Sequence, residues 1–385
     1  MTKDRAEYNL RPPMGQGIDL LGSITRVLPE RPPPRIDGSR VERLLILKLS
    51  SIGDVVHALP TASAIKRAFP SLRITWAIEE WTAPLVAGHP AVDRIVVFPT
   101  MVKWPSSPAH WVRRLTAAVR ELRSEPYDVC LDLQGLARSA ALALLSRSPL
   151  RVARAGQREG AHLVSFGVPL PAKAVHAVDE YLSVARWLGA PVDLVSFSVP
   201  LPRPAAETAD ALLAARGVGP DRPIIVVNPS AAQRWKNWPA ERWVVVMDAL
   251  GDCGAVVLIG TAAQAPAHAE IAAAAACRPI DLTGRTTLAE AIALVDRAAL
   301  HLAPDTGTVH IADAVGTPVV AVYGPSRPWR VGPYRQTANI VYHGELCGRG
   351  CPAYCSRGRR CLAAAVPEEV IAKGRAAIAA RMVRS

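Results

Sequence analysis

The sequence has few aromatic residues and no apolar run of membrane-spanning length. Aromatics make up 5% of its 385 residues, and zinc-finger, helix-turn-helix and RNA-recognition signatures are absent. These absences argue against a nucleic-acid partner. The best apolar run, Ala140 to Leu145, is far too short to cross a bilayer. The N-terminus lacks the pattern of a signal peptide, so we expect a cytoplasmic location.

Two nucleotide-binding fingerprints are also missing. The loop from Lys48 to His57 follows an apolar strand and opens a helix, yet it contains neither G-x-G-x-x-G nor G-x-x-x-x-G-K-[ST]. A dinucleotide-dependent dehydrogenase and a P-loop enzyme are therefore disfavoured.

Positive charge is abundant, with a formal net charge of +12. It can serve an anionic small substrate or an anionic membrane face, or it can be an arginine-rich surface without a partner. Part of the charge gathers in the first half of the chain, at Arg138, Arg147, Arg151, Arg154 and Arg158.

Strands and helices alternate twice along the chain, which predicts an α/β protein with two doubly wound parallel sheets. Residues 1–40 are proline-rich and predict a flexible tail, and three prolines near residue 200 predict a stiff linker. We expect domains at 41–200 and 201–365, with a last helix from about Pro367 to Ala380. The expected strands are Leu44–Leu49, Ile74–Ile78, Ile95–Phe98, Val129–Leu133, Ile224–Val227, Val256–Ile259, Leu300–Ala303 and Val319–Tyr323.

Polar loops follow several of these strands, where ligands of α/β proteins bind. In the first half, Asp54 opens a helix, where the simpler alternative is a capping role, and Gln134 and Arg138 follow the strand that ends near Leu133. In the second half, Ser230 and Lys236 can meet a phosphate, although a lysine in a surface loop is the common alternative.

The stretch from Pro304 to Ser326 is the most informative. It predicts a strand, a turn at Asp305, Thr306 and Gly307, and a helix whose first N–H groups favour an anion. Hydroxyl and carboxylate side chains beside such N–H groups suit a sugar nucleotide.

Taken in order, these motifs resemble glycosyltransferase family 9, the ADP-heptose:lipopolysaccharide heptosyltransferases. The resemblance spans about residues 43 to 370 and rests on Ser50 to Pro60, Asp132 to Leu136, Lys236 to Pro239, Leu282 to Gly284, Asp305 to His310 and Tyr323 to Ser326. It implies a GT-B fold: two Rossmann-like domains facing across a cleft, with the last helix returning to the first domain.

The resemblance also implies an inverting transfer that needs no metal for catalysis. Asp54 would be the general base, and Lys236 would neutralise the leaving diphosphate. The implied donor-binding residues are Ser230, Thr286, Leu288, Asp305, Thr306, Gly307, Thr308 and His310. The implied acceptor-binding residues are Ser51, Gly53, His57, Gln134 and Arg138.

The implied partners are ADP-heptose and a lipid A–Kdo or heptosylated inner-core acceptor, met at the cytoplasmic face of the inner membrane. Two alternatives remain: the same fold with another nucleotide sugar or a protein acceptor, and a nucleotide-sugar-binding protein without turnover.

Four cysteines cluster near the C-terminus: Cys347, Cys351, Cys355 and Cys361. Thiols this close in a cytosolic protein are candidate ligands of a structural metal, although their spacing matches no common zinc or iron–sulfur pattern. The alternative is a set of unligated thiols in a surface loop.

Overall fold

A computed structural model describes residues 32–101, 107–172, 174–347 and 359–382. The chain divides into two compact units, with the boundary between Pro200 and Leu201. We call the described residues before and after this boundary the N-terminal and C-terminal units.

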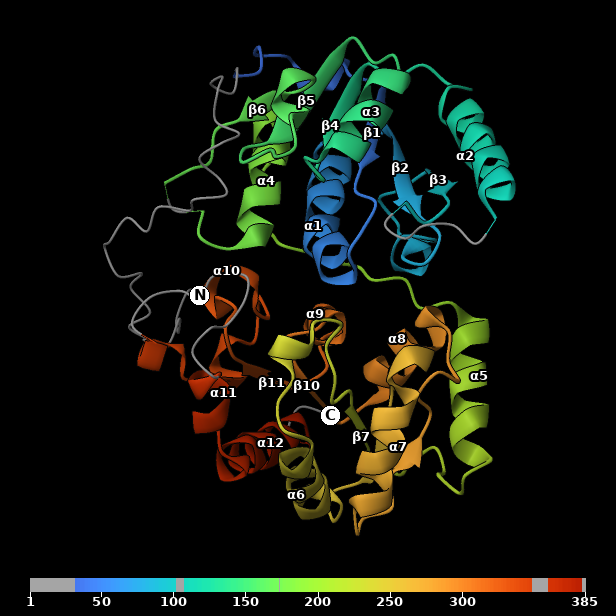
Figure 1. Ribbon diagram of the computed structural model, residues 1–385. Helices are drawn as coiled ribbons and strands as arrows, with labels where there is room; N and C mark the ends of the chain where they lie inside the picture. The colour runs from blue at the N-terminus through green and yellow to red at the C-terminus, as the bar shows by residue number, and fades with distance from the viewer. Residues whose placement is uncertain (1–31, 102–106, 173, 348–358, 383–385) are drawn as a thin grey trace. The chain divides into compact units, whose positions relative to one another are not determined.

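The N-terminal unit is built on a six-stranded parallel sheet of order β3-β2-β1-β4-β5-β6 (Figure 1). Its strands are β1 (Arg43–Leu47), β2 (Arg73–Glu79), β3 (Arg94–Phe98), β4 (Val129–Asp132), β5 (Leu150–Arg154) and β6 (Phe166–Val168). Its helices are α1 (Ile52–Ala68), α2 (Pro108–Leu122), α3 (Ala137–Leu145) and α4 (Ala177–Trp187).

The C-terminal unit repeats this plan with the sheet order β12-β11-β10-β7-β8-β9. Its strands are β7 (Ile224–Val227), β8 (Ala255–Leu258), β9 (Ile280–Asp281), β10 (Leu300–Pro304), β11 (Val319–Tyr323) and β12 (Ile340–Tyr342). Its helices are α5 (Arg203–Ala214), α6 (Ala240–Leu250), α7 (Ala265–Ala274), α8 (Leu288–Arg297), α9 (Gly307–Val315), α10 (Pro328–Val331), α11 (Arg360–Ala364) and α12 (Pro367–Met382).

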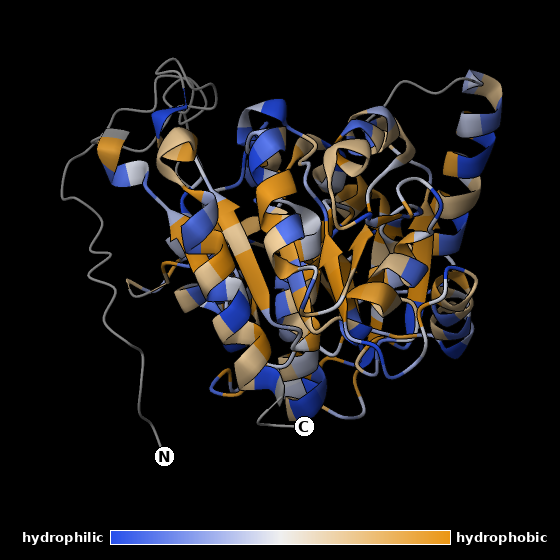
Figure 2. Cartoon of the chain, turned by 90° about the horizontal axis from the view of Figure 1, so that it is seen from below, coloured by the Kyte–Doolittle hydropathy of each residue, from blue (hydrophilic) through white to orange (hydrophobic). Residues whose placement is uncertain are grey.

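The central strands of both sheets are buried and largely apolar, as strands covered by helices must be. Every residue of β7, β8, β10 and β11 is buried, and Figure 2 shows strands coloured hydrophobic between helices of mixed colour. The prediction of two doubly wound parallel sheets is confirmed, and all eight expected strands form.

Residues 32–40 belong to the predicted tail and are described by the structure. Gly38–Arg40 forms a 3-10 turn capped by Asp37, and Gly38 is buried against Phe69 and the Leu188 carbonyl. A Cβ at Gly38 would lie 2.7 Å from the Phe69 ring, so glycine permits this close approach. The last proline of the predicted linker, Pro204, lies instead in the first turn of α5.

Helix α12 packs on the C-terminal unit, and the implied return of the last helix to the first domain remains a prediction. Val370 and Ile378 are buried in the core of the C-terminal unit with Met247 and Leu250 of α6. Gly374 also lies against Leu250. A Cβ added at Gly374 would be 3.1 Å from the Leu250 side chain, so α6 and α12 pack closely. This apolar burial holds the described part of the helix on its own unit.

Candidate active site

The order of each sheet places two strand ends at a topological switch point. In the N-terminal unit the switch point lies between β1 and β4, and in the C-terminal unit it lies between β7 and β10. The chain leaves these neighbouring strands toward opposite sides of the sheet, so the loops after them diverge and leave a crevice for a ligand. The motifs that contain Asp54, Gln134, Lys236 and Asp305 lie in these loops.

Asp54 lies in the first turn of α1, just beyond the end of β1. Its carboxylate accepts hydrogen bonds from the Ser51 hydroxyl at 2.9 Å and from the Ser51 N–H at 3.4 Å, forming a capping box. The capping role predicted as the simpler alternative is therefore present. It leaves carboxylate Oδ1 outside the capping box, and the side chain is partly exposed. Capping and proton transfer are compatible in this geometry.

Buried charge surrounds Asp54. The Lys48 side chain is only 2% exposed, and its ammonium lies 5.1 Å from the centre of the Tyr181 ring. Arg154 approaches the same ring at 5.7 Å and pairs with Glu180 at 3.2 Å. Burial raises the pKa of Asp54, but the Lys48 charge, the Ser51 hydrogen bonds and the Arg154 charge outweigh burial and leave the pKa below its usual value. Asp54 is thus ionised at neutral pH.

The predicted acceptor residues gather on the loops after β1 and β4. Ser51 caps α1, and Gly53 lies in its first turn. Gln134 is buried, and its carbonyl oxygen accepts from the N–H groups of Leu49 at 3.2 Å and Ser50 at 3.3 Å. The β4 loop thereby holds the β1 loop directly.

His57 and Arg138 face protein groups at this end of the sheet. His57 is 4% exposed, and its ring packs edge-on against His176 with centroids 5.1 Å apart. Arg138 pairs with Glu79 and donates to the Ser50 hydroxyl, both at 2.8 Å. Their predicted contact with an acceptor remains a prediction.

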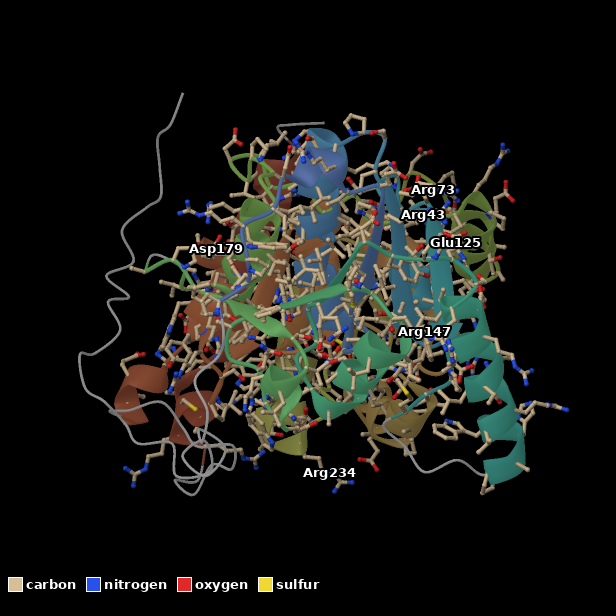
Figure 3. All side chains as sticks on the ribbon, turned by 90° about the horizontal axis from the view of Figure 1, so that it is seen from above. Arg43, Arg73, Glu125, Arg147, Asp179 and Arg234 are labelled. Atoms are coloured by element: carbon tan, nitrogen blue, oxygen red, sulfur yellow. The ribbon has the colours of Figure 1, made fainter. Side chains whose placement is uncertain are left out.

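An ion pair marks the switch point of the C-terminal unit. Lys236 ends a 3-10 turn (Arg234–Lys236) that follows β7, and its ammonium lies 2.7 Å from carboxylate Oδ2 of Asp305, directly after β10. Asp305 is 6% exposed. Arg234, in the same 3-10 turn as Lys236, is exposed, and its side chain extends away from the ribbon (Figure 3). The sequence motifs after β7 and β10 are therefore brought together.

The Thr308 hydroxyl forms hydrogen bonds with a residue of β10 and with the residue that follows β7. His301 of β10 is fully buried, which lowers its pKa to about 4 and keeps the ring neutral. Its Nδ1–H donates to the Val226 carbonyl at 3.0 Å, so Nε2 accepts from the Thr308 hydroxyl at 2.9 Å. Asn228 donates to the same hydroxyl at 3.4 Å. The Thr308 proton is thus used within the protein.

The remaining predicted donor residues lie on three loops. Thr306 is the N-cap of α9 without a side-chain cap hydrogen bond, Gly307 is its first residue, and His310 is buried in the same helix. Ser230 is 9% exposed, and its carbonyl accepts from Gln264 at 3.1 Å. The α9 end therefore keeps N–H groups for an anion.

Thr286 and Leu288 lie at the start of α8, after the edge strand β9. Thr287, between them, is the N-cap of the helix, and its hydroxyl accepts from the Glu290 N–H. Strand β9 is separated from β7 by β8, so these two residues are further from the switch point than Asp305.

The predicted cysteine site falls largely outside the described residues. Cys351 and Cys355 are not described, and Cys361 is buried in the apolar core of the C-terminal unit. Within the described ranges, no group of three or more histidine, cysteine or acidic residues could hold a metal ion. The structural metal remains a prediction.

Sequence reasoning missed several residues that shape the site: Lys48, Glu79, Arg154, Tyr181, Asn228 and His301. Two of them carried a signal in the sequence: Lys48 opens the loop that contains Asp54, and Arg154 belongs to the arginine cluster of the first half. Across the described residues, no helix is long and apolar enough to span a bilayer.

Two Rossmann-like units, each with polar loops at its switch point, define a protein of the GT-B class. The family model "Glycosyltransferase family 9 (heptosyltransferase)" matches residues 115–356. The chain therefore belongs to glycosyltransferase family 9, and it is a heptosyltransferase-type transferase, as the motifs predicted.

Curated relatives agree with this assignment. The chain is 28% identical over 311 residues to lipopolysaccharide heptosyltransferase 1 of Salmonella typhimurium, covering 76% of this chain and 91% of the relative. It is 24% identical over 306 residues to the lipopolysaccharide core heptosyltransferase OpsX of Haemophilus influenzae, covering 77% and 83%.

Solved structures share the fold. A family 9 glycosyltransferase from Veillonella parvula superposes with a TM-score of 0.76 at 23% identity, covering 90% of this chain and 99% of that one. Escherichia coli heptosyltransferase WaaC, solved with ADP, superposes with a TM-score of 0.62 at 26% identity, covering 77% and 91%.

Proposed function

We propose that this protein transfers heptose from ADP-heptose to a Kdo or heptose residue of the lipopolysaccharide inner core, with inversion at the anomeric carbon. Family membership and the names of the curated relatives support the donor and the acceptor class. The observation that carries the mechanism is the ionised carboxylate of Asp54, placed at the switch point of the N-terminal unit.

Asp54 acts as the general base. It takes the proton from an acceptor hydroxyl while the oxygen forms a bond to the anomeric carbon of the heptose. The bond from that carbon to ADP breaks on the opposite face of the sugar, so the configuration inverts. The low pKa keeps Asp54 in the proton-accepting form at neutral pH.

The C-terminal unit binds the donor and stabilises the leaving ADP. Lys236 provides a positive charge for the diphosphate, and the N-terminus of α9 provides N–H groups. In the structure Lys236 is held by Asp305, which fixes the lysine near the α9 end before the donor arrives. The acceptor is anionic, which suits the arginines of the N-terminal unit and a site at the cytoplasmic membrane face.

The test is a transfer assay with defined substrates. The purified protein is incubated with ADP-heptose and lipopolysaccharides truncated after Kdo or after the first heptose, and the products are read by mass spectrometry. We expect a heptose-sized gain on one of these acceptors and none when ADP-heptose is omitted. ADP binding by calorimetry without a gain on any inner-core acceptor would contradict the proposal and favour a binding protein.

A further inference from the structure

A buried acidic side chain is linked by polar contacts to the loop between β1 and α1, which precedes Asp54. Glu79 ends β2, and its side chain is 0% exposed. One carboxylate oxygen pairs with Arg138 at 2.8 Å, and the other accepts from the Trp81 indole N–H at 2.7 Å. Arg138 uses a second guanidinium nitrogen to donate to the Ser50 hydroxyl at 2.8 Å. A chain of polar contacts therefore runs from β2 through α3 to the β1 loop.

Further hydrogen bonds hold the backbone of the same loop. The Leu49 carbonyl accepts from the Glu79 N–H at 3.1 Å and from the Thr82 hydroxyl at 2.7 Å. The side-chain oxygen of Gln134 accepts hydrogen bonds from the N–H groups of Leu49 and Ser50. The residue after Ser50 is Ser51, whose hydroxyl and N–H fix the Asp54 carboxylate. Ser50 is thus one residue away from the group that orients Asp54.

From these contacts we infer that Glu79 and Arg138 are positioning residues for the transfer reaction, acting on Asp54 through Ser50 and Ser51. The inference rests on the proposed role of Asp54 as general base. Neither residue needs to touch substrate. Arg138 spends two guanidinium nitrogens on Glu79 and Ser50, which assigns it to the support of the loop rather than to the acceptor.

The charge on Glu79 matters for this role. A carboxylate without solvent contact is stable only when paired, and here Arg138 is its charged partner. Glu79→Gln keeps the size and one acceptor oxygen but leaves the Arg138 charge without its counter-ion. The Arg138 side chain, which is 22% exposed, can then turn toward solvent, and Ser50 loses its donor.

Glu80→Gln provides a matched control. Glu80 is the next residue, and it also forms an arginine ion pair, with Arg114 at 2.6 Å. That pair is exposed and does not contact the β1 loop. A difference between the two glutamine variants therefore reports on the loop rather than on the loss of one negative charge.

The kinetic test measures heptose transfer with saturating ADP-heptose and a varied acceptor. Glu79→Gln should lower kcat by up to about 100-fold with the acceptor KM changed by less than about threefold, because misplaced reacting groups slow the chemical step. Glu80→Gln should match the wild type. Ser50→Ala, which leaves the buried ion pair intact, should lower kcat in the same sense. A raised acceptor KM with unchanged kcat in Glu79→Gln, or equal rates in all variants, would overturn the inference.

Hydrogen exchange tests the same contacts without any substrate. Amide protection from Ser50 to Val55 should fall in Glu79→Gln and in Ser50→Ala but not in Glu80→Gln, while the amides of β7 and β10 stay protected. Unchanged protection of the β1 loop in Glu79→Gln would overturn the positioning role even if the wild type transfers no heptose. The failure of the proposed function is therefore distinguishable from the failure of this inference.

Discussion

At the scale of single residues, the pKa of Asp54 depends on a balance between burial and nearby positive charge. Burial alone would favour its protonated form, and the buried Lys48 ammonium is the largest of the effects that oppose burial. Arg154 also lowers the pKa of Asp54, but it is paired with Glu180 at 3.2 Å. Lys48 is therefore the main charge that keeps Asp54 ionised.

Replacing Lys48 by Met should shift the acid limb of the pH–rate profile. The folded-state pKa of Asp54 is now lowered, so the base form persists until the pH falls below the usual carboxyl range. Without the Lys48 charge the pKa rises, and kcat/KM should begin to fall at a higher pH than in the wild type. The profile is measured by transfer assays from acidic to neutral pH.

Lys66→Met is the control for this shift. Lys66 lies in the last turn of α1, the helix that carries Asp54, and pairs with Asp93 at 2.9 Å. The acid limb of the pH–rate profile of Lys66→Met should coincide with that of the wild type. An unshifted limb in Lys48→Met would show that another group sets the pKa of Asp54.

The sequence allowed us to predict the positions of Asp54, Lys236 and Asp305 but not their surroundings. Each of the three follows an apolar strand in a recognisable motif, so its place at a sheet edge could be inferred. Glu79 and Tyr181 carry no such signal, because their roles come from contacts with residues 59 and 133 positions away, Arg138 and Lys48. Such contacts depend on the tertiary fold.

At the scale of elements, eight strands were predictable from apolar runs and four were not. The missed strands are β5, β6, β9 and β12. β5 contains Arg151 and Arg154, which interrupt its apolar pattern, and β9 has only two residues. The core position of α12 beside α6 was not predicted from the sequence either.

The packing of α12 predicts a stability difference between two substitutions. Ile378 is 5% exposed in the core of the C-terminal unit, whereas Val366, just before the helix, is 43% exposed. Ile378→Ala should reduce the free energy of unfolding by about 2–5 kcal/mol, because a buried cavity remains. Val366→Ala should change it by less than about 0.5 kcal/mol. Urea denaturation measures both, and equal midpoints would contradict this packing.

At the scale of the whole molecule, the chain uses one sheet order twice for two chemical tasks. The switch point of the N-terminal unit holds an ionised carboxylate, and that of the C-terminal unit holds a lysine–aspartate pair beside the start of α9. The first suits deprotonation of an alcohol, and the second suits binding of a diphosphate. A glycosyltransferase needs both.

The most direct test of this account is the rate of heptose transfer by Asp54→Asn. The amide keeps the size of the side chain and the hydrogen bond from Ser51, but it cannot take the acceptor proton. We predict that kcat falls by about 10²–10⁴-fold, the usual contribution of a general base, with the affinity for ADP-heptose unchanged. Asp37→Asn, at an exposed turn, should be fully active. Transfer by Asp54→Asn at a rate near that of the wild type would contradict the account.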